Sequence, residues 1–115
     1  MQLPNRASAF IQIDKLTKYL LAETHKVGKG KAKFFRVLGF DSSNLELLED
    51  ALRNIARKEK VVEVVETEHG HKYVIIGSVT GPSGKSATIL TVWMIDVGAN
   101  APRFITARPY KEKNA

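Results

Sequence analysis

The chain has 115 residues, a formal net charge of +6 at neutral pH and no cysteine. This length supports one domain, 1–115, with an ordered core over about 12–109 and flexible termini. The lack of cysteine excludes disulfide frameworks, thiol nucleophiles and cysteine-based zinc sites. Residues 1–6 lack the apolar core of a signal peptide, and no apolar run approaches the roughly 20 residues that span a bilayer. These absences predict a cytoplasmic protein without a membrane partner.

Three helices are predicted in the first half of the chain. The first covers about 14–22, with Asp14 as its N-cap, and the second covers about 30–38, with Gly39 as its C-cap. The run Ser43-Asn44-Leu45-Glu46 matches a capping box, in which a hydroxyl and a Glu satisfy free amides at a helix start. It predicts a third helix to about residue 58, with apolar residues at the 3.6-residue period.

Beyond residue 60 the pattern becomes that of strands, predicted over 61–67, 72–79, 86–97 and 102–108. Turns at 68–71 and 81–84 join the first three of these strands. The turn Gly81-Pro82-Ser83-Gly84 is not a phosphate-binding loop, because a strand rather than a helix follows it. The order predicts an α+β fold, with three N-terminal helices packed on one face of a four-stranded antiparallel sheet.

The two faces of that sheet are expected to differ in chemistry. Because side chains alternate along a strand, we expect Leu90, Val92 and Met94 to face the helices. The open face then carries a set that can hydrogen-bond, stack on a base and pair with a phosphate: Thr91, Trp93, Thr106 and Arg108. The alternative is an ordinary strand, since Thr and Trp are also good strand formers.

Charge is segregated along the chain. Residues 1–40 hold eight Lys/Arg and two Asp/Glu, residues 41–70 hold four and eight, and residues 71–115 hold six and two. A basic first and last third around an acidic middle suits a polyanionic partner such as RNA. The alternative is a generic solubilising surface.

One loop, 23–33, combines a histidine with glycines and lysines: His25, Gly28, Lys29, Gly30, Lys31 and Lys33. Glycines let the backbone approach a ligand, and lysines near a helix N-terminus favour anions. Histidine titrates near neutral pH, so it can exchange the protons of RNA transesterification without a metal. The alternative is a solvated basic loop with an idle histidine. His69 and His71 lack a third ligand, so no metal or other cofactor is predicted.

The order of these motifs resembles a small bacterial domain family whose members occur alone and at the C-terminal ends of polymorphic toxins. The resemblance covers about residues 14–109. It rests on His25, Gly28, Lys31-Ala32-Lys33-Phe34-Phe35, Leu38-Gly39, Tyr73, Thr80-Gly81-Pro82-Ser83-Gly84, Thr91 to Asp96, Gly98, Pro102-Arg103 and Thr106. It implies a toxin, and the helices-then-sheet layout looks like that of the barnase, colicin and RelE ribonucleases. Lys26 departs from the proline that follows the histidine in other members.

The resulting hypothesis is a metal-independent ribonuclease of bacterial toxin type, cleaving RNA by 2′-hydroxyl transesterification. The expected catalytic residues are His25, Lys31, Arg103 and Thr106, and the expected substrate-binding residues are Lys29, Lys33, Thr91, Trp93 and Arg108. The expected partners are RNA and an acidic antitoxin or immunity protein. The hypothesis requires the segment holding His25 to fold over the open face beside Arg103. The alternative is a non-catalytic nucleic-acid-binding module, or a protein-interaction module that uses the acidic third helix.

Overall fold

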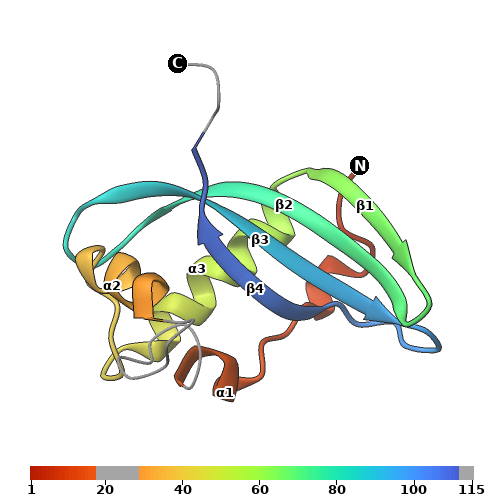
Figure 1. Ribbon diagram of the computed structural model, residues 1–115, viewed down its shortest axis with the longest axis horizontal. Coiled ribbons are helices and arrows are strands. Elements are labelled where there is room, and N and C mark those ends of the chain that lie inside the picture. Colours follow the sequence, from red (N-terminus) through yellow and green to blue (C-terminus); the bar gives the residue numbers. More distant parts are fainter. Residues whose placement is uncertain (18–28, 112–115) are drawn as a thin grey trace.

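This computed structural model describes residues 1–17 and 29–111. Its helices are η1 (Arg6–Ser8), α1 (Ile13–Lys15), α2 (Lys29–Val37) and α3 (Leu45–Lys58). Its strands are β1 (Val61–Thr67), β2 (Gly70–Thr80), β3 (Ser86–Asp96) and β4 (Arg103–Pro109). The strands form an antiparallel sheet in the order β1-β2-β3-β4 (Figure 1). The predicted α+β fold is confirmed, although part of the predicted helix over 14–22 lies outside the described residues.

Helix α3 covers one face of the sheet (Figure 1). Leu48, Leu52 and Ile55 are buried at the spacing that the 3.6-residue period predicts. The helix approaches β2 closely at Gly77, where an added Cβ would lie 2.9 Å from Ile55 Cγ1. The face of β2 that carries Gly77 therefore packs directly against α3.

The helix ends differ in part from the predicted caps. Asn44 is the N-cap of α3 but caps no helix amide with its side chain. Instead, its Oδ1 accepts from the Asp41 amide at 2.8 Å, and its Nδ2 donates to the Gly39 carbonyl at 2.9 Å. The predicted capping box is therefore replaced by a link to the end of α2. Gly39 adopts φ +101°, as its predicted capping role requires, whereas Asp14 lies inside the first turn of α1 after the N-cap Gln12.

The N-terminal segment belongs to the core, which begins before the predicted boundary at residue 12. Leu3 is 1% exposed. Gln2 forms an isolated antiparallel bridge with Lys60, and Phe10 forms a parallel one with Arg103. The segment thus reaches from the residue before β1 to the start of β4.

The faces of β3 are the reverse of those predicted. Thr91 and Trp93 are fully buried. Trp93 Nε1 donates to the Thr91 hydroxyl at 2.9 Å, and that hydroxyl donates to the Ile75 carbonyl at 2.8 Å. The Trp93 ring also meets Phe104 edge-on, with 5.3 Å between ring centroids. Because these polar groups satisfy one another, they can lie in the core without an unpaired donor.

Candidate nucleic-acid interface

Strand β4 carries a β-bulge beside the buried tryptophan. Val92 pairs with Thr106 and Trp93 pairs with Phe104, so Ile105 is an extra residue without a partner on β3. An extra residue shifts the alternation of side chains between the two faces of a strand. Residues before and after Ile105 therefore share a face that simple alternation would not give them.

The bulge aligns three polar side chains, which we name the β4 polar column: Arg103, Thr106 and Arg108. The register sets them opposite three alternate residues of β3: Met94, Val92 and Leu90. Since Thr91 and Trp93 occupy the helix-covered face, the column lies on the other face. Successive rows are two residues apart, about 6–7 Å along the strand. A bulge that re-aims side chains in this way is a feature often found beside functional sites.

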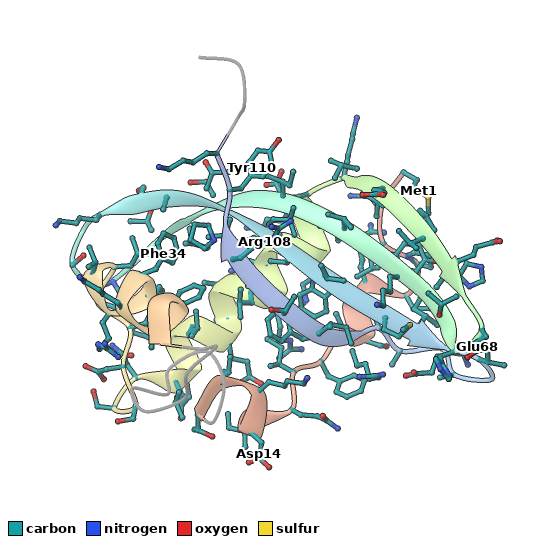
Figure 2. The ribbon with its side chains drawn as sticks, viewed as in Figure 1. Met1, Asp14, Phe34, Glu68, Arg108 and Tyr110 are labelled. Carbon is teal, nitrogen blue, oxygen red and sulfur yellow. The ribbon has the colours of Figure 1, made fainter. Side chains whose placement is uncertain are left out.

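The face that carries the column has no described helix over it. Its central residues on β2 and β3 are apolar and half-buried: Val74, Ile76, Leu90 and Val92. Leu90, Val92 and the buried Met94, which were expected to face the helices, thus belong to the uncovered face. Arg108 is exposed and lies on β4 well away from Glu68 at the β1–β2 turn (Figure 2). The column therefore forms a polar margin beside an apolar strip.

Arg103 is held by a carboxylate on the same face. Its Nε donates to Asp96 Oδ2 at 2.7 Å, and its Nη2 donates to Asp96 Oδ1 at 3.1 Å. The hydrogen bond from Arg103 holds the pKa of Asp96 below its usual value, and the same bond raises the pKa of Arg103. This fork uses two of the five N–H donors of a guanidinium, so the group is oriented and keeps other donors for an anion.

The pair predicts a pH-dependent contribution to stability. Because the pKa of Asp96 is depressed in the folded state, its contribution is complete above the unfolded value near 4 and is lost as the pH falls through the folded value. We expect Asp96→Asn to lower the urea midpoint slightly at pH 7. The difference from the native chain should disappear at lower pH. A difference that persisted unchanged at pH 2 would contradict the ion pair.

The two edges of the sheet carry opposite charge. Strand β1 and the turn after it, residues 61–68, contain three glutamates and no Lys or Arg. At the opposite edge, β4 contributes Arg103 and Arg108, and α2 packs beside it with an exposed Lys33. A polyanion is therefore attracted to the β4 edge and repelled from the β1 edge.

Lys33 is exposed on α2, and the other predicted site residues separate into three groups. Arg103, Thr106 and Arg108 come together on the uncovered face, as the column described above. Thr91 and Trp93 lie in the core, so the predicted base stacking by Trp93 is not available to a ligand on that face. His25 lies outside the described residues, as do the side chains of Lys29 and Lys31, although the backbone of both lysines begins α2.

A second histidine, His69 of the predicted turn at 68–71, lies at the Arg103 end of the column. The His69 carbonyl accepts from the Val97 amide at 3.0 Å, which ties the β1–β2 turn to the end of β3. The charge of His69 also contributes, after that of Arg103, to lowering the pKa of Asp96. The hairpin register could have predicted that His69 lies near Asp96. If the pairing of β2 with β3 ends at Asp96, the β1–β2 turn, which directly precedes β2, must lie beside Asp96.

The other candidate sites hold fewer groups that could bind an ion or transfer a proton. In residues 1–17 and 29–111, no group of three or more potential ligands could hold a metal ion. Two cavities of about 280 and 340 Å³ lie along α3 and share the lining residues Ala51, Asn54 and Thr80. Neither is lined by a histidine. Over the same residues, no helix has the length and apolar character needed to cross a bilayer.

Comparison with known proteins is consistent with this fold. Residues 2–111 match the model of a family described as a domain of unknown function, DUF6883. No curated protein matches the chain. Among solved structures, it is similar to a chain of a contact-dependent growth inhibition toxin–immunity protein complex from Klebsiella pneumoniae 342, at 17% identity and a TM-score of 0.73. The alignment covers 93% of this chain and 97% of that chain, and at this identity it shows a shared fold. By its match over almost its whole length, the chain belongs to the DUF6883 family.

Proposed function

We propose that the chain is a metal-independent ribonuclease of bacterial toxin type, which holds RNA on the uncovered face of the sheet along β4. The observation that carries the proposal is the bulge at Ile105, which aligns Arg103, Thr106 and Arg108 on that face. Two guanidinium groups flanking a hydroxyl suit a phosphodiester backbone. The fold shared with a chain of a toxin–immunity complex supports the toxin assignment.

The proposed reaction is an internal transesterification. The ribose 2′-oxygen bonds to the adjacent phosphorus as the 5′-oxygen leaves, giving a 2′,3′-cyclic phosphate and a 5′-hydroxyl end. One group takes the 2′-hydroxyl proton, another protonates the leaving oxygen, and cations stabilise the charge that builds on the phosphorane. No metal or other cofactor is required.

The residues divide these tasks by chemistry. His25 acts as general acid or base, and His69, within electrostatic reach of Asp96, is the candidate for the complementary role. Arg103 and Lys31 stabilise the scissile phosphate, and Thr106 orients it by hydrogen bonding. Arg108, Lys29 and Lys33 bind flanking phosphates. Thr91 and Trp93 support the sheet from the core instead of touching RNA.

A toxin of this kind needs a restraint in the cell that makes it. We propose an acidic immunity protein or antitoxin that covers the β4 polar column, because a carboxylate-rich surface would pair with the same guanidinium groups as RNA. Such a partner would inhibit by competition. Its effect on RNA cleavage would therefore be overcome by raising the RNA concentration.

The proposal is tested by incubating the purified chain with total cellular RNA in EDTA. We expect cleavage that leaves 2′,3′-cyclic phosphate ends, and a loss of about 10²-fold or more in His25→Ala, the usual contribution of a general acid or base. His71→Ala is the matched control. That exposed side chain faces Tyr73, at 6.5 Å between ring centroids, on the helix side of the sheet.

Each outcome separates the alternatives. Equal cleavage by the native chain and His25→Ala removes His25 from the mechanism. If RNA is bound but remains intact, the chain is a binding module. This alternative is favoured because the Asp96 carboxylate already accepts two hydrogen bonds from the Arg103 guanidinium. If RNA is neither bound at low salt nor cleaved, the remaining alternative is a protein-interaction domain.

A further inference from the structure

Strand β1 leaves one edge of the sheet unpaired. It is the terminal strand of the sheet and pairs with β2 on its inner side. On its outer side, the Gln2–Lys60 bridge lies just before the strand begins. Beyond it, no described segment pairs with residues 62–67. A free edge presents a row of backbone N–H and C=O groups to which another strand can bind.

The side chains of this edge are unusually apolar for a surface strand. Val62, Val64 and Val65 are 58%, 43% and 39% exposed. The register sets Val64 opposite Tyr73, on the helix-covered face, and Val65 opposite Lys72, on the uncovered face. Exposed valine therefore lies on both faces of the strand, where it would contact both rows of side chains of an added strand.

Glutamates flank these valines. Glu63 lies opposite Val74 on the uncovered face, and Glu66 lies opposite His71 on the helix-covered face. Glu66 Oε1 is 3.3 Å from His71 Nε2, but its side chain is still 83% exposed and remains accessible. The edge thus reads acidic–apolar–apolar–acidic from Glu63 to Glu66, in a chain whose net charge is +6.

We propose that β1 is a docking edge for an extended segment of a partner protein, which adds to the sheet as a fifth strand. Charge complementarity defines that segment as basic–apolar–apolar–basic, with a Lys or Arg opposite Glu63 and opposite Glu66. Its two apolar residues pack against Val64 and Val65. Backbone hydrogen bonds supply the affinity, and the paired side chains set the register. This surface is separate from the β4 polar column and does not depend on the proposed ribonuclease activity.

A second copy of this chain is less complementary to this edge than a basic segment. Residues directly opposite each other in an antiparallel pair lie on the same face, so two β1 strands would pair about Val64 or about Val65. Glu63 and Glu66 would then lie opposite Val or Thr and would gain no basic partner. Nucleic acid is disfavoured because its phosphates would meet three glutamates, including Glu68 in the following turn.

The test uses a synthetic peptide, Thr-Lys-Val-Val-Lys-Thr, titrated into the ¹⁵N-labelled full chain while amide chemical shifts are followed. The control peptides replace both Lys with Glu, or methylate the backbone nitrogens of both Val. The matched protein variant is Glu63→Lys/Glu66→Lys, which changes two exposed side chains and leaves the valines in place. We expect amide shifts centred on residues 62–66. We also expect the variant to bind the peptide with two Lys about tenfold more weakly than the native chain does. The variant should prefer the control peptide in which both Lys are replaced by Glu.

Three results would overturn the docking edge. One is the absence of shifts in β1 with the Lys peptide in millimolar excess, which would mean that the glutamates only protect the edge against aggregation. Another is binding that survives the charge reversal or the methylated backbone. The third is self-association of the chain through β1 in sedimentation, since that would make a second copy the occupant.

Discussion

Trp93→Ala is expected to lower the free energy of unfolding by about 3–5 kcal/mol, the range for removing a large aromatic side chain from a core. Trp93 is fully buried, meets Phe104 edge-on and donates to Thr91. Small domains are stabilised by only about 5–15 kcal/mol, so this change removes a large part of the total. Urea unfolding followed by circular dichroism measures it.

Trp93→Phe separates a core role from a role in binding RNA. It keeps most of the ring and loses the N–H, while the Thr91 hydroxyl still donates to the Ile75 carbonyl. We expect a smaller loss of stability, about 1–2 kcal/mol, and unchanged affinity for RNA. If Trp93 stacked on a base, affinity would fall by the equivalent of about 1–3 kcal/mol with little change in stability. That outcome would show that the tryptophan is available to a ligand.

Much of the fold could be predicted from local patterns. The strand order follows from short turns, because hairpins joined by a few residues place neighbouring strands side by side. Helix α3 follows from apolar residues at 3.6-residue spacing, and Gly39 ends α2 because only glycine adopts its positive φ without strain. The capping box at residues 43–46 was wrong because the Asn44 side chain bonds to the end of α2, a contact distant from the local motif.

The faces of β3 could not be assigned from polarity. Both faces of Ile89 to Ile95 carry large apolar side chains, so the prediction relied on Thr91 being polar. Its hydroxyl is satisfied by a carbonyl on β2 and an indole N–H on the same strand, and both partners depend on tertiary structure. A Thr and a Trp two residues apart share a face whichever way the strand turns. The prediction that Thr91 and Trp93 share a face is therefore right, but the predicted face is wrong.

The candidate site depends on one residue that has no local signal. With strict alternation, Arg103 faces the opposite side from Thr106 and Arg108, and the three cannot act on one ligand. The bulge at Ile105 brings them together, and it directly follows Phe104, which packs edge-on against Trp93. The chemistry of these three residues predicts them as site residues. Their common face follows only from the strand register.

Removing both arginines of the column should weaken RNA binding about 10- to 100-fold at low salt. Each Arg–phosphate contact releases counterions, so log K for a single strand falls with log salt by about 0.7 per contact. Arg103→Ala/Arg108→Ala should flatten that slope by about 1.4. Lys58→Ala/Lys60→Ala, at exposed positions by the β1 edge, removes the same charge and is the matched control. The arginine variant and the lysine variant are both built on Asp96→Asn, so that no unpaired carboxylate remains beside the site.

The salt dependence of RNA binding by these two variants tests most directly whether the uncovered face along β4 holds RNA. Fluorescence anisotropy with a 2′-O-methyl oligonucleotide measures binding alone, because this ligand lacks the attacking hydroxyl. Relative to the Asp96→Asn parent, we expect the slope to flatten in the Arg103/Arg108 variant and to stay unchanged in the Lys58/Lys60 variant. Equal flattening in both variants would mean that binding follows net charge. Flattening in the lysine variant alone would place RNA on another face.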